Sequence, residues 1–118
     1  MKHMRIPGLP GPNDYEDGQF AVRCAGTSTA DAWWAIIEPH GTSDEKPPWH
    51  DVDQWLYVIS GTGEARRDST DTPEPISTGS LVLICAFEKH EIRNTGDAPL
   101  VTINVFAPPL AKEPKIDC

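Results

Sequence analysis

Twelve prolines and nine glycines divide this 118-residue chain into short segments. Proline removes a backbone donor and glycine permits positive φ angles, so both residues favour turns over long helices. No segment shows the sustained apolar period of 3.6 residues, with capping residues, that an amphipathic helix requires. The runs between the turns are rich in aromatic and β-branched residues, which are typical of strands. We therefore predict an all-β sandwich or barrel with no substantial helix.

The clearest strand signal is the run from Gln54 to Ser60, QWLYVIS. The turn Gly61-Thr62-Gly63 follows it, and a second strand is expected to end near Arg66. Because glycine lets the backbone reverse its direction, this pattern predicts a β-hairpin at the centre of the fold.

Alternation along the same run places apolar residues on both faces of the strand. If Gln54 points inward, Leu56 and Val58 also point inward. The outward residues are then Trp55, Tyr57 and Ile59. Such an apolar outer stripe needs cover from a second layer or from a partner molecule. We therefore predict a homodimer.

The same signals predict the remaining strands and the domain organisation. Five further strands are expected: Phe20–Cys24, Ala32–Glu38, Gly79–Ile84, His90–Asn94 and Leu100–Phe106. The proline-bearing segments 39–48 and 68–78 are expected to be loops. The chain then has an irregular N-terminal arm at residues 1–19, one β-barrel domain at 20–109 and an extended C-terminal tail at 110–118.

Charge and cysteine content restrict the class of protein. The formal net charge is −8. Because nucleic acids and anionic membranes are polyanions, neither is an expected partner. No apolar run approaches the roughly 20 residues that span a bilayer, and the first residues lack the apolar core of a signal peptide. The three cysteines, Cys24, Cys85 and Cys118, show no paired spacing. We therefore expect a cytoplasmic protein with free thiols.

Two histidines lie beside expected strands. His50 precedes Gln54 by four residues, and His90 opens the expected strand His90–Asn94. Taken alone, they are best interpreted as a loop histidine bonded to the backbone and a strand histidine. Their spacing relative to the glycines changes this interpretation.

The spacing resembles the two motifs of small single-domain cupins. The first cupin motif, G(X)5HXH(X)3–4E(X)6G, aligns when its final glycine is placed on Gly61. The second, G(X)5PXG(X)2H(X)3N, aligns from Gly79 through His90 to Asn94, with Cys85 and Phe87 replacing its proline and glycine. The resemblance covers roughly residues 32–109 and implies the cupin double-stranded β-helix, a jelly-roll barrel.

The resemblance also implies one divalent transition metal ion. In metal-binding cupins, two histidines and a glutamate of the first motif and the histidine of the second motif hold the ion. This chain has Pro48 at the first histidine and Gln54 at the glutamate, which leaves His50, Gln54 and His90 as candidate ligands. Three neutral ligands leave the charge of the ion uncompensated, so Zn, Ni or Cu would bind more easily than Mn or Fe. Asp51 and Asp53 are candidates for an additional ligand.

Two functions are compatible with this site. The first is a small metalloenzyme of the dioxygenase, isomerase or lyase class that acts on a small oxygen-rich or anionic molecule. Trp34, Trp49 and Phe106 are its expected pocket wall, and Glu38 and Cys85 are candidate bases. The alternative is a non-catalytic cupin with a degenerate metal site that binds a small ligand by shape.

Overall fold

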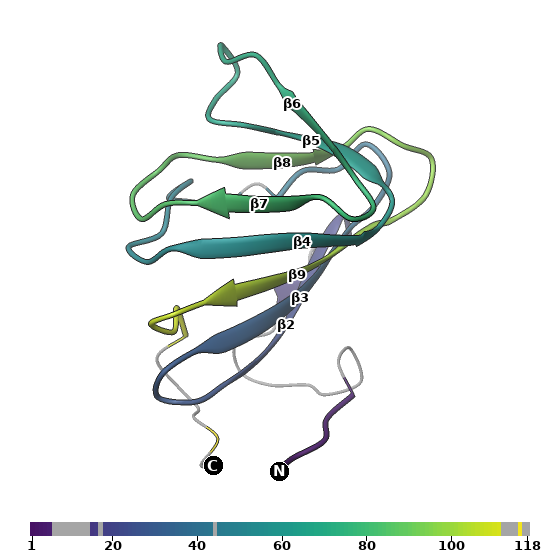
Figure 1. Ribbon diagram of the computed structural model, residues 1–118. Coiled ribbons are helices and arrows are strands. Elements are labelled where there is room, and N and C mark those ends of the chain that lie inside the picture. Colours follow the sequence, from purple (N-terminus) through teal and green to yellow (C-terminus); the bar gives the residue numbers. More distant parts are fainter. Residues whose placement is uncertain (6–14, 17, 44, 112–115, 117–118) are drawn as a thin grey trace.

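The computed structural model describes residues 1–5, 15–16, 18–43, 45–111 and 116. The described residues form nine strands and no helix (Figure 1). The strands are β1 (Tyr15–Glu16), β2 (Phe20–Gly26), β3 (Asp31–Ile37), β4 (Gln54–Ser60), β5 (Thr62–Arg66), β6 (Glu74–Ser77), β7 (Leu81–Ile84), β8 (Glu91–Asn94) and β9 (Leu100–Phe106). The all-β prediction is confirmed, and within these residues there is no helix of the length and apolarity that a membrane crossing needs.

The strands form two antiparallel sheets that face each other. One sheet has the order β1-β2-β3-β9-β4-β7, and the other has the order β6-β5-β8. The last strand, β9, lies between β3 and β4, so strands far apart in sequence pair side by side (Figure 1). The core between the sheets consists of Ile37, Leu56, Val58, Ile76, Ile92 and Leu100. Two packed antiparallel sheets with such crossed connections form a jelly roll.

The predicted hairpin at residues 54–66 is wrong, because β4 and β5 belong to different sheets. β4 pairs with β7 and β9, whereas β5 pairs with β6 and β8. Gly61 adopts a φ of 98°, and a Cβ there would lie 2.6 Å from the carbonyl oxygen of Pro99. Glycine is therefore needed at this turn, but the turn carries the chain from one layer to the other. A locally tight turn does not determine which strands exchange hydrogen bonds.

The predicted alternation along β4 is confirmed. The side chains of Leu56 and Val58 are 2% and 0% exposed, whereas those of Trp55 and Tyr57 are 47% and 46% exposed. The residues of β4 that face the interior therefore pack into the core between the two sheets. The outward residues leave an apolar surface on the larger sheet.

Strand β6 lies in the segment 68–78, which was expected to be a loop. The prolines of this segment obscured the strand signal, because proline cannot donate to a sheet ladder. β6 is an edge strand, where proline is tolerated, and its Pro75 pairs with Glu64 of β5. Ile76 is 5% exposed and anchors the strand to the core.

Segments near both ends of the chain bond to the larger sheet. β1 falls within the expected irregular arm and pairs with β2, while residues 6–14 and 17 lie outside the described part. Near the other end, the backbone N–H of Ala111 donates to Asp31 Oδ2 at 2.8 Å. The N–H of Ile116 donates to the carbonyl of Gly26 at 2.8 Å. The rest of the expected tail, with Cys118, lies outside the described residues; Cys85 is a free, exposed thiol.

Candidate metal centre

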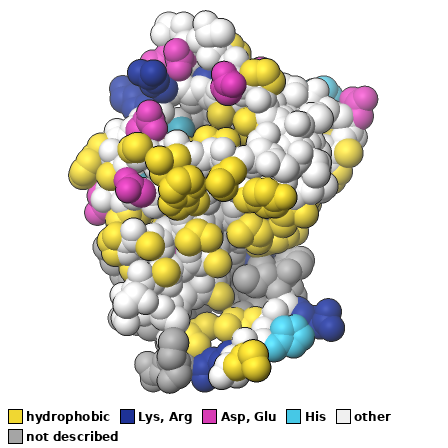
Figure 2. All heavy atoms as spheres, viewed as in Figure 1, with side chains coloured by type: hydrophobic (Ala, Val, Ile, Leu, Met, Phe, Trp, Pro, Cys, Tyr) yellow, Lys and Arg dark blue, Asp and Glu magenta, His cyan; other side chains and the backbone are white. Residues whose placement is uncertain are grey.

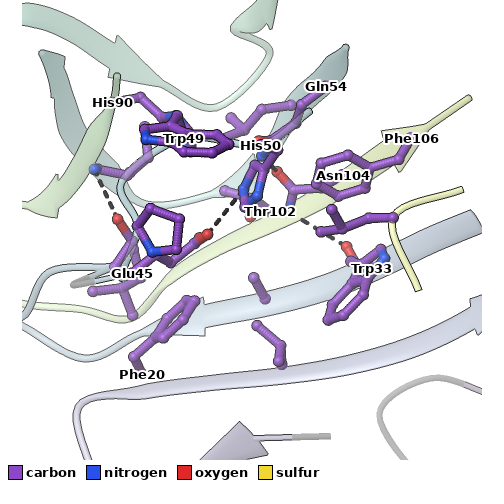
Figure 3. A pocket seen from close by; sticks show the side chains of 18 of the residues that line it. Phe20, Trp33, Glu45, Trp49, His50, Gln54, His90, Thr102, Asn104 and Phe106 are labelled. Atoms are coloured by element: carbon purple, nitrogen blue, oxygen red, sulfur yellow. Dashed lines mark hydrogen bonds and ion pairs between the residues drawn. The ribbon is translucent and has the colours of Figure 1, made fainter. Parts of the chain in front are cut away.

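A cavity of about 440 Å³ lies between the two sheets. Its walls come from the inward positions of β2, β3, β4, β8 and β9 and from the loop at residues 43–50 (Figure 3). The inward positions of β9 illustrate the alternation: Thr102, Asn104 and Phe106 line the cavity, whereas Val105 is an exposed outer residue. The cavity volume lies within the range of about 300–1,000 Å³ that is typical of small-molecule sites.

Glu45, His50 and His90 meet at one side of this cavity. Each offers a donor atom, and these three atoms all lie within 4.8 Å of one another. The Nε2 of His50 is 2.9 Å from Glu45 Oε2, and the rings of His50 and His90 are 5.0 Å apart between centroids. Two imidazole nitrogens and one carboxylate form a donor set suited to a divalent transition metal ion.

Backbone hydrogen bonds hold the two histidine-bearing loops together. The N–H of His90 donates to the carbonyl of Pro48 at 2.8 Å, and the N–H of Phe87 donates to the carbonyl of His50 at 2.6 Å. Pro48, which replaces the first histidine of the cupin motif, thus contributes its backbone carbonyl instead of a ligand. These two bonds hold the loops that carry His50 and His90 next to each other.

One ring nitrogen of His90 is engaged in a hydrogen bond, and this determines that the other ring nitrogen carries the lone pair. Its Nδ1 lies 3.0 Å from the carbonyl oxygen of Glu88. A carbonyl oxygen only accepts, so we assign the proton to Nδ1 and the lone pair to Nε2. Nε2 is buried and has no hydrogen-bond partner among the described residues. This is the arrangement of a metal-ligating histidine whose other nitrogen is fixed by a backbone carbonyl.

A chain of amide hydrogen bonds orients Gln54, which is 5% exposed. The Nδ2 of Asn104 donates to Thr102 Oγ1 at 2.9 Å and to the carbonyl of Trp33 at 3.4 Å. Because the Trp33 carbonyl requires a donor, Asn104 turns its Oδ1 toward Gln54 and accepts from Gln54 Nε2 at 2.8 Å. Gln54 Oε1 is then left buried without a partner in the described part of the chain.

The structure therefore brings His50, Gln54 and His90 to one cavity and adds Glu45 to them. Sequence analysis missed Glu45, because it lies in the loop before the first motif and outside the motif spacing. The candidates Asp51 and Asp53 are both exposed, and Asp53 Oδ1 accepts a hydrogen bond from the N–H of Ala86 at 2.9 Å. Neither lines the cavity. Glu45 is the acidic residue that lines the cavity among the described residues.

The expected pocket wall needs one correction. Trp49 and Phe106 line the cavity, but Trp34 does not, and Trp33 takes its place. Trp34 pairs with Ile103 across β3 and β9, and this register places it on the outer face of the sheet. Trp33 faces inward and makes an edge contact with Phe106 at 6.1 Å between centroids. Glu38 and Cys85 are exposed and lie outside the cavity.

Asn94, the last residue of the second motif, has a structural role. It is fully buried, and its Nδ2 donates to the carbonyls of Ile37 and Ala98, each at 2.8 Å. Its Oδ1 accepts from the N–H of Gly96 at 2.8 Å. The asparagine therefore organises the turn between β8 and β9 at a distance from the histidines.

The sequence model of the cupin domain matches residues 33–106 of this chain. The chain belongs to the cupin family. This match runs from within β3 to the end of β9 and includes every candidate metal ligand. No curated protein sequence matches the chain.

Solved structures resemble this cupin along most of its length. Ectoine synthase from P. lautus is 18% identical with a TM-score of 0.73, over 94% of this chain and 80% of that protein. A Bacillus halodurans protein is 27% identical with a TM-score of 0.67, over 80% of this chain and 73% of the other. Oxalate decarboxylase from Lactobacillus farciminis is 22% identical with a TM-score of 0.67, over 80% of this chain but 30% of that longer protein. The two named enzymes share the fold of this cupin.

Proposed function

We propose that this cupin binds one divalent transition metal ion through Glu45, His50 and His90, with Gln54 Oε1 as a fourth donor. The observation that carries the proposal is a pair of buried, unpartnered acceptor atoms, His90 Nε2 and Gln54 Oε1. They lie beside the 2.9 Å contact between Glu45 Oε2 and His50 Nε2. Buried polar atoms without partners are costly, and a bound cation would satisfy both. The residues present therefore fit a metal.

Glu45 changes the expected electrostatics of the site. The neutral set of His50, Gln54 and His90 would leave the full charge of the ion uncompensated. With Glu45 among the ligands, one negative charge lies next to the ion, which strengthens binding. Nitrogen and oxygen donors of this kind accept Zn, Ni, Cu, Mn and Fe, and affinity follows the usual divalent order.

We propose catalysis on a small organic molecule that carries an oxygen donor or an anionic group. A bound ion would supply Lewis-acid polarisation of a substrate oxygen or activation of water or O₂. The protein's own residues would orient the substrate and exclude water from it, through the walls formed by Trp33, Trp49 and Phe106. Isomerase, lyase and dioxygenase chemistry all belong to the reactions that such an ion could support.

The metal proposal is tested by elemental analysis of purified protein. Wild type, His90→Ala and His3→Ala are dialysed against a weak chelator and then against Zn²⁺, Ni²⁺ or Mn²⁺. We expect about one ion per chain in wild type and in His3→Ala, because His3 is an exposed residue far from the motifs. His90→Ala should lose the ion. A wild type that takes up none of the three metals would refute the proposal.

A non-catalytic role is the second candidate function. Among the described residues that line the cavity, the titratable ones are Glu45, Lys46, His50 and His90. Three of these are assigned to the metal, so few groups remain for general acid–base catalysis. A barrel that binds metal and ligand without turnover would show saturable ligand binding and no product in a substrate screen followed by mass spectrometry.

We also propose that the protein is a homodimer through the outer face of the larger sheet. Exposed apolar residues of β4, β7 and β9 are adjacent on this face: Trp55, Tyr57, Leu81, Leu83 and Val105. Figure 2 shows hydrophobic side chains gathered over these strands. A contiguous apolar patch of this kind is unusual on a monomer and favours association. A monomeric mass in light scattering at micromolar concentration would contradict this proposal.

A further inference from the structure

We propose that the ligand of this cavity is an amphipathic carboxylate with an apolar body, and not a polyhydroxylated sugar acid. The inference rests on the proposed metal site and names the class of molecule that the site takes. Its carboxylate would lie at the metal side of the cavity. Its body would fill the space between the metal residues and strands β2 and β3.

Much of the remaining cavity wall is apolar. Its apolar side chains come from both sheets and are Phe20, Val22, Ala35, Ile37, Leu56 and Ile92. In Figure 3 the side chains of His50, His90 and Gln54 lie together on one side, and Phe20 and Trp33 lie on the other. The cavity thus has a polar side at the proposed metal ligands and a mainly apolar wall elsewhere.

Away from the proposed ligands, most polar side chains in the cavity wall are already engaged; the exception is Trp33 Nε1, a buried donor without a partner among the described residues. Ser43 Oγ accepts from the N–H of Ile92 at 3.1 Å, and Thr102 Oγ1 accepts from Asn104 at 2.9 Å. Asn104 itself is bonded to Gln54 and to Trp33. A sugar acid would bring several hydroxyl groups into this space and find few free partners. Each buried, unpaired hydroxyl lowers affinity by about tenfold or more.

The size of the cavity limits the length of the body. Its volume of about 440 Å³ is roughly three times that of an apolar cavity of about 150 Å³ that binds benzene. This space accommodates a ligand of roughly 10 to 20 non-hydrogen atoms. An arylalkyl or alicyclic acid is of this size.

Lys46 supplies the charge that selects an acid. It lines the cavity next to Glu45, and its side chain is exposed. None of the ion pairs between described residues involves Lys46. The exposed side chain would place its ammonium group on a carboxylate that also contacts the ion. A metal and a lysine on one side of an otherwise apolar space favour one anionic head over several neutral hydroxyls.

The test compares ligands on zinc-loaded wild-type protein by isothermal titration calorimetry. The probes are 3-phenylpropionate, gluconate, which is of similar size, and acetate, which has the head without the body. We expect 3-phenylpropionate to bind at least tenfold more tightly than either of the others. Equal or tighter binding of gluconate, with zinc bound at one ion per chain, would overturn this inference and leave the metal proposal intact. A protein that takes up no metal would overturn both.

Two matched pairs of variants locate the ligand. Ala35→Phe fills the apolar side of the cavity, while Ala32→Phe makes the same change on the outer face of the same strand. We expect Ala35→Phe to weaken 3-phenylpropionate binding at least tenfold with zinc content unchanged, and Ala32→Phe to leave it within twofold. Lys46→Gln should weaken binding several-fold, whereas Lys46→Arg should restore it. Undiminished binding in Ala35→Phe would overturn the placement of the body in this space.

Discussion

The side-chain amide of Gln54 donates a 2.8 Å hydrogen bond to Oδ1 of Asn104, and this bond turns Gln54 Oε1 away from Asn104. The orientation originates in the backbone, because the carbonyl of Trp33 accepts from the other end of Asn104 at 3.4 Å. A residue 50 positions away in sequence thus determines which atom Gln54 presents.

Replacing Asn104 should impair metal binding without removing a ligand. In Asn104→Leu, Gln54 loses the acceptor that orients its amide, and we expect metal affinity to fall by about 10- to 100-fold. Competition with a chromogenic chelator measures this affinity. Thr102→Val is the matched control, because it removes one partner of Asn104 but leaves the Gln54–Asn104 bond. An Asn104→Leu protein with wild-type affinity would show that Gln54 is not a ligand.

Glu45 should be essential for tight metal binding. Glu45→Gln keeps the size of the side chain but removes the carboxylate nearest to His50 and His90. We expect the dissociation constant for Zn²⁺ to rise at least tenfold, because the charge of the ion is no longer compensated. Glu38→Gln makes the same change at an exposed residue outside the cavity and should have no effect. Equal zinc affinities for the two variants would show that Glu45 is not a metal ligand.

Metal should stabilise the folded protein. Zinc at 100 times its dissociation constant adds about 2.7 kcal/mol to the free energy of unfolding if it binds only the native state. For a domain of this length, this corresponds to a rise in Tm on the order of 10 °C. Differential scanning fluorimetry with and without zinc measures the shift. The His90→Ala variant should show little or no shift, and a shift as large as that of wild type would argue for binding elsewhere.

The loss in free energy of unfolding when a leucine is replaced by alanine should depend on how buried the leucine is. Leu100 is 0% exposed in the core, whereas Leu81 is 61% exposed on the outer face. Leu100→Ala should lower the free energy of unfolding by about 2–5 kcal/mol through lost packing and a residual cavity. Leu81→Ala should change it by less than about 1 kcal/mol. Urea denaturation at low protein concentration, where association contributes least, compares the two variants.

A charge on the outer face of β4 should abolish the proposed dimer. Tyr57 is 46% exposed and pairs with Leu81 of β7 and Ile103 of β9. Tyr57→Glu would place a carboxylate in the middle of an apolar interface, where its burial is costly. We expect a monomer in light scattering coupled to size exclusion. Ser69→Glu, at an exposed loop position, should leave the mass unchanged.

The sequence determined the features that depend on a few neighbouring residues. The strands Gln54–Ser60 and Leu100–Phe106 were predicted with the bounds that the structure has. Alternation along the first of these correctly separated buried from exposed residues, because side chains in a strand project to opposite faces in turn. Motif spacing likewise indicated the cupin fold and selected His50, Gln54 and His90, which the structure brings to one cavity.

Tertiary structure decided what depends on contacts between distant residues. The turn at Gly61 has the same local chemistry in a hairpin and in a crossing between sheets, so only the pairing of β5 with β8 distinguishes them. Trp33 and Trp34 are adjacent and equally apolar, and the register with β9 alone determines which one faces the cavity. Glu45 reaches the site because its loop packs against residues near His90, and no periodic pattern encodes that approach. Backbone preference and alternation act over a few residues, whereas a binding site requires side chains that the fold brings together from different strands.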